Sequence, residues 1–172
     1  MKLRNAALML ALVALLVGVS VAPNATSREG GIPTELGETV EVSGCACHGD
    51  SSSGVALTLD APDNFTAGET YTLTITMESS VTTAGENQGG FFLSITQGSL
   101  ASADNSTQVI DGYLTHTETG NDQRSWAFEW TAPSDDTRIA DFTLYGNAVD
   151  GNGAPDSSDQ WNRATFAVPG TN

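Results

Sequence analysis

Apolar and polar residues alternate along much of this chain, most regularly over residues 70–77. Tyr71, Leu73, Ile75 and Met77 occupy one set of alternate positions, and threonines occupy every position between them. A period of two residues is typical of a β-strand with one buried face. This segment therefore predicts a strand whose threonine face points toward solvent.

The same alternation recurs in short runs that are separated by clusters of Gly, Pro, Asn and Asp. Trp126, Phe128 and Trp130 share one face of such a run, and Ala140, Phe142 and Leu144 share another. The remaining predicted strands cover residues 55–59, 91–95, 113–117 and 164–168. No window of similar length beyond the N-terminal segment has the 3.6-residue apolar repeat of a helix. The pattern predicts an all-β fold, an antiparallel β-sandwich of seven to nine strands.

The N-terminal segment has a different character. Residues 1–5 are basic and residues 6–22 carry no charge, with small residues at 20–22. This is the pattern of a secretory signal peptide, while the length of the apolar run also suits an uncleaved membrane anchor. Both alternatives place the rest of the chain outside the cytoplasm. Residues 23–38 are polar and aperiodic, which predicts a flexible linker before a sandwich domain at 39–169.

Charge excludes one class of partner. The chain has 21 acidic and six basic residues, and all the acids follow residue 28. Such a surface repels phosphate backbones, so we expect no nucleic acid partner. It also disfavours an anionic membrane surface, which leaves the N-terminal segment as the expected membrane contact. Cell-surface or redox proteins are the expected partners.

One short segment holds most of the cysteine and histidine residues of the chain. It covers residues 43–50 and reads Ser-Gly-Cys-Ala-Cys-His-Gly-Asp. It holds both cysteines of the chain, Cys45 and Cys47, and one of its two histidines, His48. The other histidine is His116. Three of the four Cys and His residues in the chain thus lie within four positions, which indicates a chemical site.

Three interpretations of this segment remain open. In an exported chain Cys45 and Cys47 could form a disulfide, although a ring that spans one intervening residue is strained and adds little stability. A c-type haem could be attached at Cys47 with His48 as axial ligand and His116 as second ligand, although the usual spacing is Cys-x-x-Cys-His. A zinc or copper ion could be bound by both cysteines and both histidines. The cofactor is thus a haem, a transition metal or none.

A weaker candidate is the glycine-rich loop that begins at Asp150. Asp150, Asn152 and Asp156 present oxygen ligands that suit calcium, but Ala154 stands where another ligand would be needed. No nucleophile elbow, phosphate-binding glycine loop or His-Glu-x-x-His motif is present. We therefore predict no catalytic residues and expect the protein not to be an enzyme.

Six segments in order resemble a known family. They are residues 44–49, 67–75, 89–91, 115–117, 126–133 and 145–153. Together they resemble the choice-of-anchor V domain of prokaryotic surface proteins, a relative of the reelin-type (Reeler) extracellular domain. The resemblance covers about residues 43–168.

This resemblance implies a β-sandwich displayed at the cell surface. Many members carry Cys-x-x-Cys-His near the start of the domain and Thr-His later, which correspond here to Cys47, His48 and His116, with Cys45 only loosely at the first cysteine. The spacing is one residue shorter in this chain. Members often end in a membrane helix or sorting signal, whereas this sequence stops at Asn172, so the resemblance implies retention through the N-terminal segment or another protein. The expected function is a surface module with a Cys-x-Cys-His site for electron transfer or sensing. The alternative is a structural or adhesive surface domain with a local Cys45–Cys47 disulfide.

Overall fold

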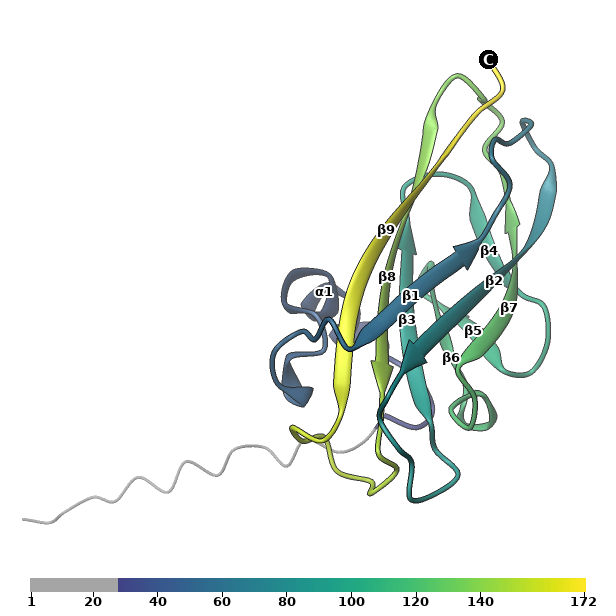
Figure 1. Cartoon of the computed structure of the whole chain (residues 1–172). Coiled ribbons are helices and arrows are strands. Elements are labelled where there is room, and N and C mark those ends of the chain that lie inside the picture. The colour runs from purple at the N-terminus through teal and green to yellow at the C-terminus, as the bar shows by residue number, and fades with distance from the viewer. Residues whose placement is uncertain (1–27) are drawn as a thin grey trace, which may run out of the picture.

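The computed structural model describes residues 28–172, and the predicted signal or anchor at 1–22 lies outside them. Nine strands form two antiparallel sheets that face each other (Figure 1). The first sheet has the order β1-β2-β7-β4. Its strands are β1 (Val55–Asp60), β2 (Thr70–Ser79), β7 (Ser125–Thr131) and β4 (Ser99–Ser102).

The second sheet has five strands in the order β5-β6-β3-β8-β9. These are β5 (Thr107–Ile110), β6 (Tyr113–His116), β3 (Gly89–Ile95), β8 (Ile139–Ala148) and β9 (Gln160–Pro169). Every pairing between neighbouring strands of the two sheets is antiparallel. The predicted all-β sandwich of seven to nine strands is confirmed.

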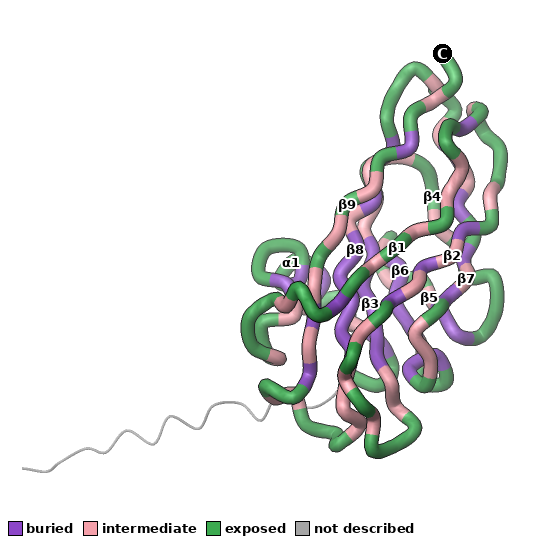
Figure 2. Tube along the Cα trace, viewed as in Figure 1, coloured by how far each residue is buried: buried purple, intermediate pink, exposed green. Residues whose placement is uncertain are grey.

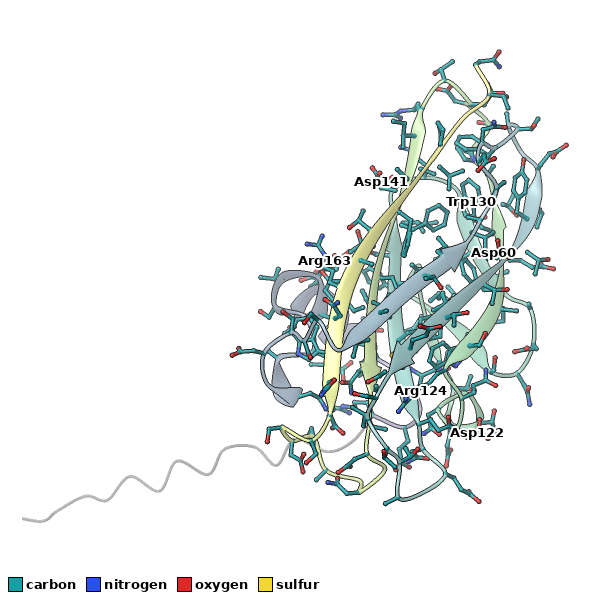
Figure 3. The ribbon with its side chains drawn as sticks, in the orientation of Figure 1. Asp60, Asp122, Arg124, Trp130, Asp141 and Arg163 are labelled. Carbon is teal, nitrogen blue, oxygen red and sulfur yellow. The ribbon has the colours of Figure 1, made fainter. Side chains whose placement is uncertain are left out.

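The core lies between the sheets, where the inner strands are the most buried (Figure 2). The predicted inward faces are buried: Leu73 and Ile75 on β2, and Trp126 and Phe128 on β7. Trp130, labelled in Figure 3, packs edge-on against Phe142 of the facing sheet at 5.1 Å between ring centroids. Burial of each such ring contributes about 1.5–3 kcal/mol, so the core holds the sandwich together.

A second, smaller cluster lies on the outer face of the five-stranded sheet. Helix α1 (Thr34–Ser43) covers it and buries Val40 among Phe92, Tyr145 and Trp161. The Tyr145 hydroxyl donates to the carbonyl of Glu41 at 2.9 Å. Figure 1 shows α1 beside β9 and β8, away from the four-stranded sheet.

The described part of the predicted linker is folded onto this sheet. Residues 34–38 lie in α1, and residues 28–32 hydrogen-bond to the strands. The difference from the expected linker at 23–38 has a physical reason. Helix α1 buries only Gly37 and Val40, so it needs no apolar stripe and leaves no 3.6-residue pattern. None of the helices within residues 28–172 is long and apolar enough to cross a membrane.

Candidate functional site

The Cys/His segment is held against the sheet by Gly44 and Trp161. Gly44 ends α1 with φ at +66°, and a side chain there would overlap the Trp161 ring. Trp161 in turn donates from Nε1 to the carbonyl of Gly49 at 2.9 Å. The chain then forms the 3₁₀ helix η1 (Ala46–His48). These two contacts hold the ends of η1 against the sheet, while none of its own residues is buried.

His48 forms the shortest polar contact of this segment, with Asp159. Its Nδ1 lies 2.6 Å from Oδ2 of Asp159, whose side chain is 2% exposed. The other carboxylate oxygen accepts the backbone N–H of Asp150 at 3.0 Å. Because a carboxylate only accepts, Nδ1 carries a proton, and in the neutral ring Nε2 keeps its lone pair. A carboxylate behind the imidazole is the usual arrangement around a histidine that ligates a metal.

His116 is placed differently, because both its ring nitrogens have protein partners. The backbone N–H of Phe91 donates to Nδ1 at 3.1 Å, and Nε2 lies 3.1 Å from the carbonyl oxygen of Arg28, to which it donates. Burial lowers the pKa of His116, against the opposing effect of the carbonyl oxygens of Phe91 and Arg28, which lie 3.3 Å from Nδ1 and 3.1 Å from Nε2. The ring packs directly over Gly90, where any side chain would overlap it. His116 is thus a neutral, fully bonded histidine in this structure.

One cavity of about 80 Å³ brings the two histidines and Cys45 together. It lies at the end of the sandwich where β8 ends and β9 begins, between η1 and the loop at 149–159. Whether His116 lies near His48, 68 positions away in the chain, could not be predicted from the sequence. In the structure both line this cavity.

The two cysteines differ in surroundings. Cys45 is partly buried in the cluster under α1, whereas Cys47 is exposed. Burial, with the nearby Cys47 as a smaller cause, raises the pKa of Cys45 to about 12. Both are free thiols here, so the Cys45–Cys47 disulfide is not formed in this structure and stays a prediction. Within residues 28–172, no three Cys, His, Asp or Glu side chains are arranged to hold a metal ion. The structure therefore does not assemble the four expected metal ligands.

The loop expected to bind calcium is held by its own hydrogen bonds. The Asn152 amide donates to Oδ2 of Asp150 and to Oδ2 of Asp156, each at 3.0 Å. The backbone N–H groups of Asn152 and Ser158 donate to the remaining oxygens of these carboxylates. An amide N–H thus lies between the two carboxylates, and the calcium site stays a prediction.

Sequence reasoning missed Asp159 and Asn147 as parts of this site. Asp159 ends the acidic loop, and nothing in the sequence separates it from the other 20 acids. Asn147 lies on β8 opposite Gly90 and Trp161. The room that Gly90 leaves beside Asn147 is taken by the His116 ring, and no pattern in the sequence marked Asn147.

Comparisons with known proteins concern the fold. No protein-family model and no curated protein matches the chain. The structure is similar to the Reelin-N domain of F-spondin, with a TM-score of 0.45, 16% identity, and coverage of 72% of this chain and 90% of that one. It is also similar to the human F-spondin reeler domain (fragment 2), with a TM-score of 0.46, 15% identity, and coverage of 78% and 99%.

A cohesin module from a Clostridium perfringens family 33 glycoside hydrolase is similar too, with a TM-score of 0.43, 12% identity, and coverage of 69% and 97%. The Reeler-type relationship and the choice-of-anchor V assignment that the sequence resemblance implied stay predictions.

Proposed function

We propose that this protein is a non-enzymatic module displayed outside the cell that holds a haem or a transition-metal ion through Nε2 of His48, for electron transfer or sensing. The observation that carries the proposal is the 2.6 Å contact between Nδ1 of His48 and the buried carboxylate of Asp159. It fixes the ring, sets the tautomer and leaves one basic nitrogen for a ligand. Export follows from the basic and apolar pattern of residues 1–22.

A haem fits the segment better than an ion with four protein ligands. Cys47 is exposed and next to His48, so one thiol is accessible for a thioether bond beside the axial ligand. Cys45 is protonated and partly buried, and both nitrogens of His116 are bonded. The cavity of about 80 Å³ holds a few water molecules rather than a porphyrin. Cys47 and His48 are therefore the residues that would hold a haem, and the haem would supply one-electron chemistry.

The test compares exported wild-type protein with His48→Ala and His116→Gln, each produced in a haem-competent host. The visible spectrum, the intact mass and the metal content are measured for all three. We expect His48→Ala to lose at least about tenfold in bound haem or metal, and His116→Gln to keep it. Circular dichroism confirms that each variant is folded. Equal loading of His48→Ala and wild type contradicts the proposal.

The second candidate is a structural or adhesive surface domain that carries no cofactor. What favours it is that both ring nitrogens of His116 are bonded by protein groups and that apolar side chains pack the core between the sheets. In that case wild-type protein from the same host is colourless and free of metal. A mass lower by two hydrogens then identifies the Cys45–Cys47 disulfide.

A further inference from the structure

Asn147 carries a buried acceptor that the described residues leave without a partner. The residue is 8% exposed, and no group within residues 28–172 hydrogen-bonds to its Oδ1. Buried side-chain oxygens are nearly always paired in native proteins, so an unpaired one calls for a physical cause. Asn147 lines the same cavity as His48 and His116. The simplest cause is an occupant of the cavity that donates to Oδ1.

The charges around the cavity favour a cationic occupant. Glu29, Asp150 and Asp159 line it, and Arg28 is the one lysine or arginine among the described residues that do. His116 does not add positive charge, because burial lowers its pKa. His48 is paired with Asp159, and the whole chain has a net charge of −15. Anions are therefore disfavoured here.

The apolar part of the wall suits the same occupant. Phe92, which belongs to the cluster on the outer face of the sheet, is among the lining residues, and aromatic rings attract small ammonium groups. The volume of about 80 Å³ limits the occupant to a few non-hydrogen atoms, and an ammonium group has three N–H donors for acceptors such as Oδ1.

We infer that this cavity is a binding subsite for a primary ammonium group, which donates one N–H to Oδ1 of Asn147. The group belongs either to a free small amine or to a lysine side chain of a partner protein. The proposed hydrogen bond to Oδ1 of Asn147 does not itself involve His48, which lines the same cavity.

The probe is methylammonium chloride, titrated into the full ¹⁵N-labelled chain and followed by NMR. We expect saturable shifts of the Asn147 side-chain amide and of the Gly89 and Gly90 backbone amides. Tetramethylammonium chloride at the same ionic strength has no N–H donor, and it should not produce them. Equal effects of the two salts, or no saturable shift with methylammonium, overturn the inference.

Variants of Asn147 give a second measurement. Asn147→Ala should weaken methylammonium binding about tenfold or more, the factor expected for a lost hydrogen bond to a charged donor. Asn147→Asp should tighten binding, because it adds a negative charge at the same place. The matched control is Thr107→Val, which removes another buried and unpaired oxygen that does not line the cavity. Unchanged affinity in Asn147→Ala contradicts the inference.

The source of the ammonium group is distinguished by a third titration, with Nα-acetyl-lysine methylamide. Binding at least as tight as that of methylammonium indicates a lysine of a partner protein, and binding of methylammonium alone indicates a free amine. Haem and metal content are read by spectrum and mass, so failure of this subsite and failure of the proposed function appear in different measurements.

Discussion

The buried carboxylate of Asp159 holds a proton of the His48 imidazole on Nδ1, and the proposed function makes this contact the support for a ligand at Nε2. Asp159→Asn keeps the size of the side chain but removes its charge. Loss of such a carboxylate typically lowers metal affinity 10–100-fold, and we expect a loss of that order in bound haem or metal. Metal analysis and the visible spectrum measure it. Asp60→Asn, at the exposed end of β1 (Figure 3), is the control and should load like wild type.

His116 makes stability depend on pH. Its pKa is lowered in the folded state by burial, so the unfolded chain takes up a proton first as the pH falls. The stability that neutral His116 contributes is complete above its unfolded pKa of about 6.5 and is lost as the pH falls below it. The loss from this group is at most about 1.4 kcal/mol at pH 5.5.

Urea unfolding of wild type and His116→Gln at pH 7.5 and pH 5.5 tests this prediction. The free energy of unfolding should fall more for wild type than for the variant, since the carboxylates contribute equally to both. An identical fall in the two proteins would show that the pKa of His116 is the same in the folded and unfolded states.

The two thiols should react at different rates. Cys47 is exposed, whereas burial raises the pKa of Cys45 to about 12 and keeps it protonated. Only the thiolate reacts readily. For protein without bound haem or metal, we expect iodoacetamide to add one group in native conditions and two in urea, as read by intact mass. The Cys47→Ser variant should gain no iodoacetamide adduct while it is folded. Two adducts on the native wild type would contradict the assigned burial of Cys45.

At the scale of elements, Arg124 fixes the connection between β2 and β3. Its guanidinium donates to the carbonyls of Ser79, Val81 and Gln88 at 2.9–3.1 Å. Figure 3 shows it at the end of the sandwich where β2 ends. Because these are hydrogen bonds from a charged donor, Arg124→Ala should lower the free energy of unfolding by about 2 kcal/mol.

Arg124→Lys should recover only part of this loss, since an ammonium cannot span three carbonyls as the planar guanidinium does. Urea unfolding measures both variants. Arg138→Ala, at an exposed position, should change the free energy of unfolding by less than about 0.5 kcal/mol. A similarly small effect of Arg124→Ala would show that the connection is held by other groups.

Long alternating runs made the strands predictable, while the elements with few apolar residues were missed. Leu73, Ile75 and Met77 are buried as their spacing predicted. The short strands β4 and β5 have little apolar pattern, and α1 buries only Gly37 and Val40. Tertiary contacts determine whether such elements form, and these contacts cannot be read from the sequence.

The site was predictable to the same limited extent. The rarity of Cys and His pointed to residues 45–48 and to His116, and of these Cys45, His48 and His116 line one cavity, whereas Cys47 does not. The partners of the histidines could not be predicted. Asp159 is one acid among 21, and the partner of His116 Nε2 is a backbone carbonyl, which any residue could provide.

At the scale of the whole molecule, excess negative charge opposes folding. The chain has a net charge of −15, and like charges on a compact surface repel one another. Salt screens this repulsion, with a Debye length near 10 Å at 0.1 M and about 3 Å at 1 M. The thermal midpoint should therefore rise between 0.05 M and 1 M NaCl, as followed by circular dichroism. A midpoint that falls with added salt would show that attractive ion pairs outweigh the repulsion.

The proposed function depends on whether His48 holds a cofactor in the exported protein. The most direct measurement is the visible spectrum and intact mass of the chain purified after export by its native host. We predict a Soret band with a haem-sized increase in mass, or a colourless protein with about one transition-metal ion per chain. A colourless, metal-free protein of the mass given by its sequence, or lighter by two hydrogens, would contradict ligation at His48 and leave the structural surface domain as its function.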